Sequence, residues 1–107
     1  MYKDNIEYYK TQTKIVKAIA HPIRLFILEK LKDDEYCVNS LTEMIGYDVS
    51  TVSKHLSVLK NAGLISDEKR GLKVFYKLRT PCVIDMLSCV NRTVKQVAET
   101  NLEHLKR

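Results

Sequence analysis

The 107-residue sequence has no hydrophobic run of the roughly 20 residues needed to span a bilayer. Its first ten residues are polar and tyrosine-rich, without the apolar stretch of a signal peptide. We therefore expect a cytoplasmic protein with no membrane partner. The length fits one domain over residues 1–107, and 45% hydrophobic residues allow a core of modest size. Dimerisation would add buried area, so we expect a homodimer.

Cysteine is also scarce. The three cysteines, Cys37, Cys82 and Cys89, form no even disulfide framework. In a reducing compartment such residues are free thiols or metal ligands more often than structural disulfides. No Ser-His-Asp set, carboxylate pair or phosphate-cradling glycine loop is present, so the sequence does not indicate an enzyme. The excess of 18 basic over 13 acidic residues suits a polyanionic partner, although many ordinary proteins carry as much charge.

The few glycines and prolines fall where elements should end. A first helix over residues 5–20 ends at His21-Pro22, because the residue before proline avoids helical geometry, and Pro22 suits the first turn of a second helix to residue 32. Ser40 and Glu43 match a capping box, which predicts a short helix over residues 40–45.

After the turn at residues 46–48, Asp48 can cap a fourth helix that ends at Ala62-Gly63. Alternating residues then predict strands over 64–67 and 73–78, joined by a charged loop. Thr80 can cap a last helix. Its apolar residues recur at spacings of four and three, like a coiled-coil seam that needs another helix as partner: Val83, Leu87, Val90, Val94 and Val97.

The order of helix, three-residue turn, helix and basic hairpin predicts a winged helix-turn-helix, mainly α with a small β-hairpin. A major groove admits one helix, which must present short polar side chains to base edges. The candidate DNA contacts of the fourth helix are Val49, Ser50, Thr51, Ser53, Lys54, His55 and Lys60. The hairpin offers phosphate contacts from Lys69, Arg70 and Lys73.

A polar helix face or a charged hairpin tip, taken alone, is usually just solvent-exposed surface. Their joint occurrence in this order favours binding to double-stranded DNA. A protein-interaction module that uses the C-terminal seam is the rival interpretation. Such a module has no need of the basic hairpin.

Three segments carry a resemblance to a known family. Residues 48–65 resemble the recognition helix of the ArsR/SmtB family of metal-responsive repressors, residues 21–28 resemble its second-helix entry, and residues 70–78 resemble its wing. The resemblance implies four helices, a two-stranded wing and a fifth helix, with a homodimer formed through the first and last helices. It further implies a transcriptional repressor that binds an imperfect inverted repeat and is released by an inducer ion.

The family's usual metal sites are incomplete in this sequence. Its arsenic, cadmium and lead sensors carry two cysteines at the entry to the helix-turn-helix. Here Cys37 matches the first and Asn39 replaces the second. Its zinc and cobalt sensors use aspartate and histidine on the last helix, where only Cys82 is a plausible ligand. Of the histidines, we expect His21 to cap or pack and His55 to face DNA.

Three thiolates at Cys37, Cys82 and Cys89 would suit As(III) first, and also Sb(III), Cd(II) or Pb(II). Seven residues along a helix separate two α-carbons by roughly 10.5 Å, so Cys82 and Cys89 share an ion only through distortion or a second chain. Two alternatives stay open: a switch by thiol oxidation or persulfide, and cysteines that act merely as small apolar residues. DNA binding itself needs no cofactor in any of these cases.

Overall fold

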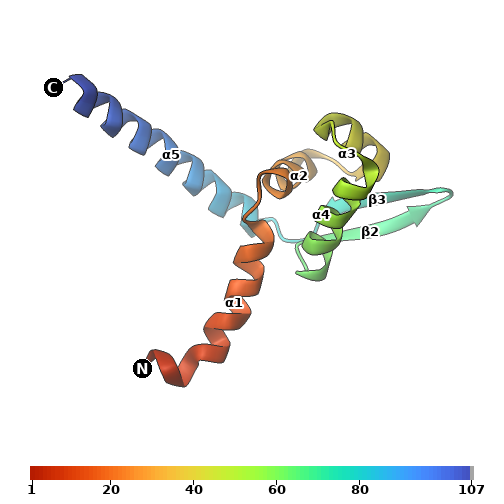
Figure 1. The fold of residues 1–107 in the computed structure, drawn as a ribbon. Helices are drawn as coiled ribbons and strands as arrows, with labels where there is room; N and C mark the ends of the chain where they lie inside the picture. Colours follow the sequence, from red (N-terminus) through yellow and green to blue (C-terminus); the bar gives the residue numbers. More distant parts are fainter. Residues whose placement is uncertain (107) are drawn as a thin grey trace.

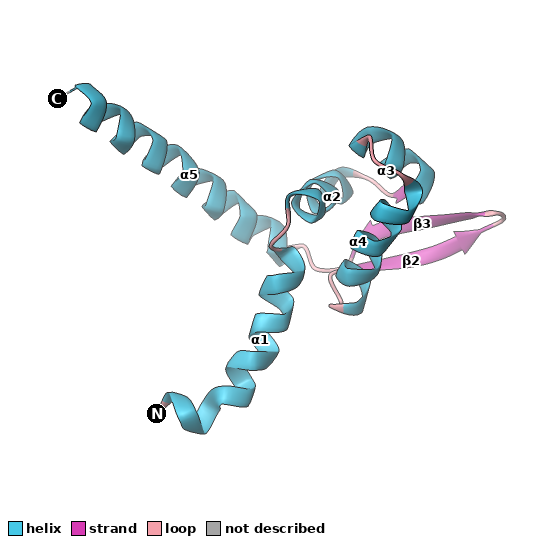
Figure 2. Cartoon of the chain, in the orientation of Figure 1, coloured by secondary structure: helices cyan, strands magenta, loops and turns pink. Residues whose placement is uncertain are grey.

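The computed structural model describes residues 1–106 as five α-helices and a small antiparallel sheet (Figure 1). In chain order the elements are η1 (Tyr2–Asn5), α1 (Ile6–Ile19), α2 (Pro22–Asp33), β1 (Tyr36–Cys37), α3 (Val38–Ile45), α4 (Val49–Asn61), β2 (Ile65–Arg70), β3 (Lys73–Leu78) and α5 (Cys82–Lys106). The mainly helical winged helix-turn-helix expected from the sequence is confirmed (Figure 2).

Local signals explain where α2 and α4 begin. The Nδ1 atom of His21 accepts a hydrogen bond from the Ile23 N–H at 3.1 Å, and Pro22 occupies the first turn of α2. Asp48 caps α4 by accepting a hydrogen bond from the Thr51 N–H at 3.2 Å. The predicted caps at His21 and Asp48 are therefore confirmed.

The predicted start of α3 is wrong. The helix begins at Val38 rather than Ser40, and Cys37 in extended conformation is its N-cap without a side-chain hydrogen bond. The Ser40 hydroxyl lies 3.3 Å from the Cys37 sulfur instead of capping the helix. Cys37 is extended because Tyr36 and Cys37 pair with β3 as a short strand, which the sequence pattern did not reveal.

The sheet has the order β1-β3-β2, and both pairs of strands are antiparallel. Strand β2 continues to Arg70, which pairs with Lys73, so the loop predicted at residues 68–71 shrinks to Gly71-Leu72. Gly71 has a φ of +63°, the left-handed geometry that a two-residue hairpin turn requires at its first position. The hairpin of β2 and β3, called the wing below, is therefore longer than predicted, and its connecting loop is shorter.

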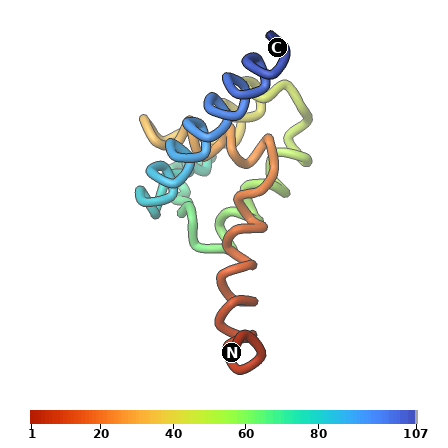
Figure 3. Tube along the Cα trace, turned by 90° about the vertical axis from the view of Figure 1, so that its left-hand side faces the viewer, coloured from red at the N-terminus to blue at the C-terminus, as the bar shows by residue number. Residues whose placement is uncertain are grey.

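The core lies where α2, α3 and α4 pack together over the sheet, and its fully buried side chains are Ile27, Leu28, Leu41, Val52, Leu56, Leu59 and Ile65. The start of α5 joins this core through buried Val83, with Leu87 packed against it. The C-terminal part of α5 extends away from the body, and α1 extends in another direction (Figures 1 and 3). No helix within residues 1–106 is long and apolar enough to cross a membrane.

Candidate nucleic-acid interface

Helix α4 is amphipathic in the way that groove insertion requires. Its inward side chains, Val52, Leu56 and Leu59, are buried in the core. The predicted contact residues near its N-terminus fall on the other side, with Thr51 half-buried and four side chains exposed: Val49, Ser50, Ser53 and Lys54. The core thus holds the helix while its polar N-terminal half stays open to a base edge or a phosphate.

His55 departs from this set. It is half-buried, its Nδ1 atom lies 3.1 Å from an Arg24 guanidinium nitrogen, and its ring centroid lies 4.2 Å from that of His21. Burial, and then the charges of His21 and Arg24, lower the pKa of His55. The structure therefore directs this side chain toward α2, away from the surface on which we had expected it.

Lys60 is also engaged within the chain. Its ammonium lies 2.9 Å from an Asp67 carboxylate oxygen, and this hydrogen-bonded ion pair raises the pKa of Lys60. The contact links the C-terminal end of α4 to β2. Lys60 thus helps to hold the β2–β3 hairpin against α4.

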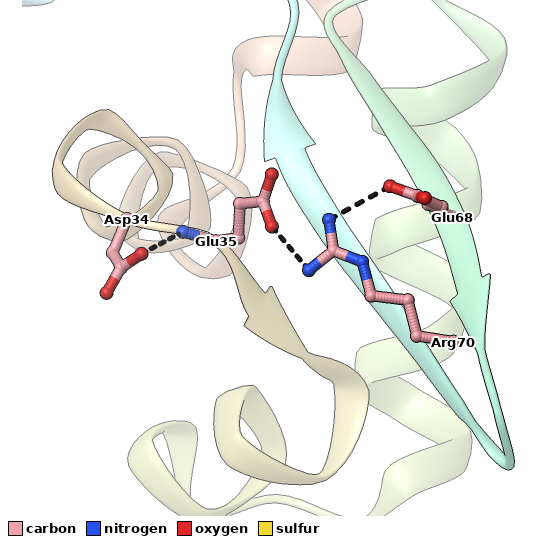
Figure 4. Close-up of polar contacts among 4 residues, drawn as sticks. All are labelled: Asp34, Glu35, Glu68 and Arg70. Atoms are coloured by element: carbon pink, nitrogen blue, oxygen red, sulfur yellow. Dashed lines mark hydrogen bonds and ion pairs between the residues drawn. The ribbon is translucent and has the colours of Figure 1, made fainter.

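The three basic residues of the wing differ in whether they form salt bridges within the protein. Lys69 and Lys73 are exposed, and no salt bridge among residues 1–106 involves either of them. Arg70, in contrast, lies 2.8 Å from a Glu35 oxygen and 2.9 Å from a Glu68 oxygen (Figure 4). Its guanidinium also stacks 4.9 Å from the centre of the Phe75 ring.

The two carboxylates raise the pKa of Arg70, Glu35 first and then Glu68, and Arg70 in turn lowers the pKa of Glu68. In the same segment, the backbone N–H of Glu35 donates to the Asp34 carboxylate at 2.7 Å (Figure 4). Arg70 therefore joins the wing to the segment before α3.

The structure places the predicted thiols apart. Cys37 is buried at the start of α3, where hydrogen bonds from Ser40, the hydroxyl first, lower the pKa of its thiol. Cys82 and Cys89 are exposed on α5, and the Arg92 guanidinium donates to the Cys89 sulfur at 3.0 Å. Within residues 1–106 of one chain, no group of three histidine, cysteine or acidic side chains could hold a metal ion.

The predicted seam of α5 divides into two parts. Val83 and Leu87 pack against the chain's own core, whereas Val90, Val94 and Val97 are exposed. An apolar groove runs along this exposed part, lined by Met86, Cys89, Val90, Thr93, Val94 and Val97. Helix α1 also exposes apolar side chains, among them Tyr8, Tyr9, Ile15 and Val16.

Sequence reasoning missed two residues that organise the interface, Arg24 and Glu35. Arg24 follows His21-Pro22 at the start of α2, so its position near a helix end was visible, but its partner on α4 lies 31 residues away. Nothing local to Glu35 indicated its ion pair with the wing.

A polar helix presented by a compact helical core, with a β-hairpin beside it, defines a winged helix-turn-helix protein. The model of the arsR family of bacterial regulatory proteins matches residues 21–67. The transcriptional repressor SdpR of Bacillus subtilis is 33% identical over 82 residues, which cover 73% of this chain and 91% of SdpR. The chain belongs to the arsR family, as the resemblance of its recognition helix and wing predicted.

Other relatives agree with this assignment. The repressor SmtB of Mycobacterium tuberculosis is 34% identical over 61% of this chain, and the match spans 48% of SmtB, about half its length. Among solved structures, M. tuberculosis Rv0081 superposes with a TM-score of 0.79 at 27% identity, covering 89% of this chain and 96% of Rv0081. HlyU of Vibrio cholerae superposes with a TM-score of 0.70 at 31% identity, covering 80% of this chain and 94% of HlyU.

Proposed function

We propose that this chain is a homodimeric transcriptional repressor that binds an imperfect inverted-repeat operator through α4 and the wing. The observation that carries the proposal is that the exposed N-terminal half of α4 occurs together with the exposed wing lysines Lys69 and Lys73, which form no salt bridge within residues 1–106. Both SdpR and SmtB are named as transcriptional repressors. A twofold dimer presents two such helices, so its operator has two related half-sites.

The DNA-binding part is tested with duplexes that the wild-type protein selects from a random pool. Fluorescence anisotropy then measures the affinity for one selected duplex. Losing a good base contact costs about 1–3 kcal/mol, so the double variant Ser50→Ala, Lys54→Gln should bind at least about fivefold more weakly. Lys95→Gln on α5 is the matched control for loss of one positive charge. Equal affinities of the two variants would show that α4 does not contact DNA through these side chains.

The exposed apolar part of α5 supports dimerisation. Val90, Val94 and Val97 recur along one face of a helix that extends beyond the chain's own core, and α1 also exposes apolar side chains. A structural neighbour from Mycobacterium bovis, with a TM-score of 0.75 at 24% identity, is described as a homodimeric winged helix-turn-helix domain. Val94→Asp should convert the dimer to a monomer in analytical ultracentrifugation, whereas Gln96→Asp should not. If the Val94→Asp protein still sediments as a dimer, this face of α5 is not the dimer interface.

The effector part of the proposal concerns the thiols. The three cysteines do not form a site within one chain, so we restrict the proposal to a thiophilic ion, arsenite first, held between two chains. Cys89 supports this, because it lines the apolar groove of the proposed dimer face. The exposed Cys82 lies on the same helix, and Cys37 is the third candidate ligand.

Release of the selected duplex is measured after addition of arsenite, antimonite, Cd(II), Pb(II) or hydrogen peroxide. We expect arsenite to release DNA and Cys82→Ser and Cys89→Ser to block the release. Release by peroxide alone, lost in the same variants, would instead indicate a switch by thiol oxidation. If the triple Cys→Ser variant still responds to arsenite, cysteine sensing is excluded.

A further inference from the structure

One side chain, Arg24 of α2, connects the helix proposed for dimerisation with the helix proposed for recognition. Its Nε donates to the Ala18 carbonyl oxygen at 2.6 Å, and one terminal nitrogen donates to the Lys17 carbonyl oxygen at 3.2 Å. These carbonyls belong to the last turn of α1, where the Lys17 carbonyl oxygen also accepts from the Ala20 N–H at 3.3 Å. The other terminal nitrogen lies 3.1 Å from Nδ1 of His55 on α4.

The chemistry of this contact depends on the protonation state of His55. A guanidinium has only donors, so the hydrogen bond exists only when Nδ1 of His55 is an unprotonated acceptor. The ring of His21, whose Nδ1 accepts from the Ile23 N–H at 3.1 Å as the cap of α2, lies next to that of His55, with the two ring centroids 4.2 Å apart. A protonated His55 imidazole cannot accept from Arg24. Acid therefore removes the Arg24–His55 hydrogen bond.

The surrounding charges act in the same direction. The charges that act on His55 are those of His21, whose ring lies 4.2 Å away, and Arg24. From α1, Lys14 and Lys17 line a groove together with Arg24, and on α4 itself Lys54 precedes His55. No salt bridge among residues 1–106 brings a carboxylate to Arg24, His21 or His55. A proton on His55 therefore adds a cation to a group of cations.

We propose that Arg24 is a positioning residue that fixes α4 to the C-terminal end of α1 through neutral His55, and that protonation of His55 releases this link and weakens DNA binding. The inference rests on the proposed DNA-binding function. The spacing of the two recognition helices in a dimer must match the half-sites of the operator. Because α1 lies in the proposed dimer interface, a link from α1 to α4 sets that spacing.

The pH dependence of DNA affinity tests this proposal. Anisotropy with the selected duplex is measured from pH 8 to pH 5.5 at constant ionic strength. The affinity of the wild type should fall as the pH drops through the pKa of His55, which burial holds below its ordinary value. The fall should be roughly tenfold per protomer for each unit by which DNA binding lowers that pKa further. His55→Gln should flatten this profile, because its amide oxygen accepts from Arg24 but does not titrate. His104→Gln, near the far end of α5, is the control and should keep the wild-type profile.

A direct contact of His55 with DNA gives the opposite sign, because a protonated imidazole would attract phosphate and acid would strengthen binding. A wild-type affinity that rises or stays constant toward pH 5.5 overturns the proposal, and so does an acid loss that persists in His55→Gln. If the wild type selects no duplex at all, the DNA-binding function itself fails and the inference fails with it. If the wild type binds the duplex but its affinity does not fall in acid, the DNA-binding function stands and only the proposed role of His55 protonation is wrong.

A second variant separates positioning from folding. Arg24→Lys keeps the positive charge, but one ammonium on a flexible stem cannot reproduce the planar fork that spans α1 and α4. It should bind the selected duplex more weakly than wild type at pH 8 and lose little further affinity in acid. Circular dichroism checks that the fold is intact. A folded Arg24→Lys protein with the wild-type profile would contradict the positioning role, and if this variant does not fold, His55→Gln carries the test alone.

Discussion

The salt dependence of DNA binding should distinguish Arg70 from Lys69, although the two are neighbours on the wing. Arg70 lies within 2.9 Å of carboxylate oxygens of both Glu35 and Glu68, whereas no salt bridge among residues 1–106 involves Lys69. Arg70 and its two partners together carry one more negative than positive charge. A phosphate must therefore displace an existing partner to reach Arg70, but meets the free ammonium of Lys69 directly.

The expected magnitude follows from counterion release. Each phosphate that a protein neutralises on B-DNA contributes about −0.9 to the slope of log affinity against log salt concentration. One such contact accounts for about 3.5-fold of the affinity lost between 50 and 200 mM salt. A dimer carries two copies of Lys69, so Lys69→Gln should make the slope shallower by about 1.8, whereas Arg70→Gln should leave the slope unchanged.

Anisotropy titrations of the selected duplex at several salt concentrations measure these slopes. The double variant Glu35→Gln, Glu68→Gln removes both competing carboxylates and should make the slope steeper by about 1.8, because Arg70 of each protomer becomes available to phosphate. If Arg70→Gln reduces the slope as much as Lys69→Gln does, Arg70 contacts DNA in spite of its partners. The assignment of Arg70 as a link within the protein would then be wrong.

Two further predictions concern stability. Leu56 is fully buried, so Leu56→Ala should lower the free energy of unfolding by about 2–5 kcal/mol. Urea titrations at fixed protein concentration measure this change, and Ser57→Ala, at an exposed position of the same helix, should have little effect. Equal effects of the two variants would contradict the packing of α4. Hydrogen bonds from Thr51, the side chain first, lower the pKa of Asp48 below its ordinary value of 3.8. The ionised Asp48 carboxylate therefore stabilises the fold above pH 3.8, and this stabilisation is lost as the pH falls through the lowered pKa. The difference in melting temperature between wild type and Asp48→Asn should therefore shrink between pH 7 and pH 3, and a constant difference would refute the charge contribution.

Elements with a local cause were predictable. Pro22 suits the first turn of α2, Asp48 caps α4, and Gly63 at a φ of +81° ends it, and each of these signals acts within a few residues. The inward and outward sides of α4 followed from its apolar spacing for the same reason. The short strand β1 has no such signal, because two residues become a strand only through pairing with β3.

The same limit applies to the candidate interface. A helix pattern identifies His55 as polar, but its partner Arg24 lies 31 residues earlier and turns it inward. A basic residue beside a hairpin tip predicts a phosphate contact, but Glu35 reaches Arg70 from the segment just before β1. Hydrogen bonds and ion pairs between distant segments depend on how the elements pack, which short-range patterns do not encode.

The order of the helices and of the hairpin strands, the inward face of α4 and the family were all determined by the amino-acid sequence, because helix caps, turn glycines and apolar periodicity act over a few residues. The tertiary structure decided which of the basic and polar side chains remain free to bind DNA. Packing brought Arg24 to His55, Asp67 to Lys60 and Glu35 to Arg70, and a charge that is satisfied within the protein is less available to a phosphate outside it.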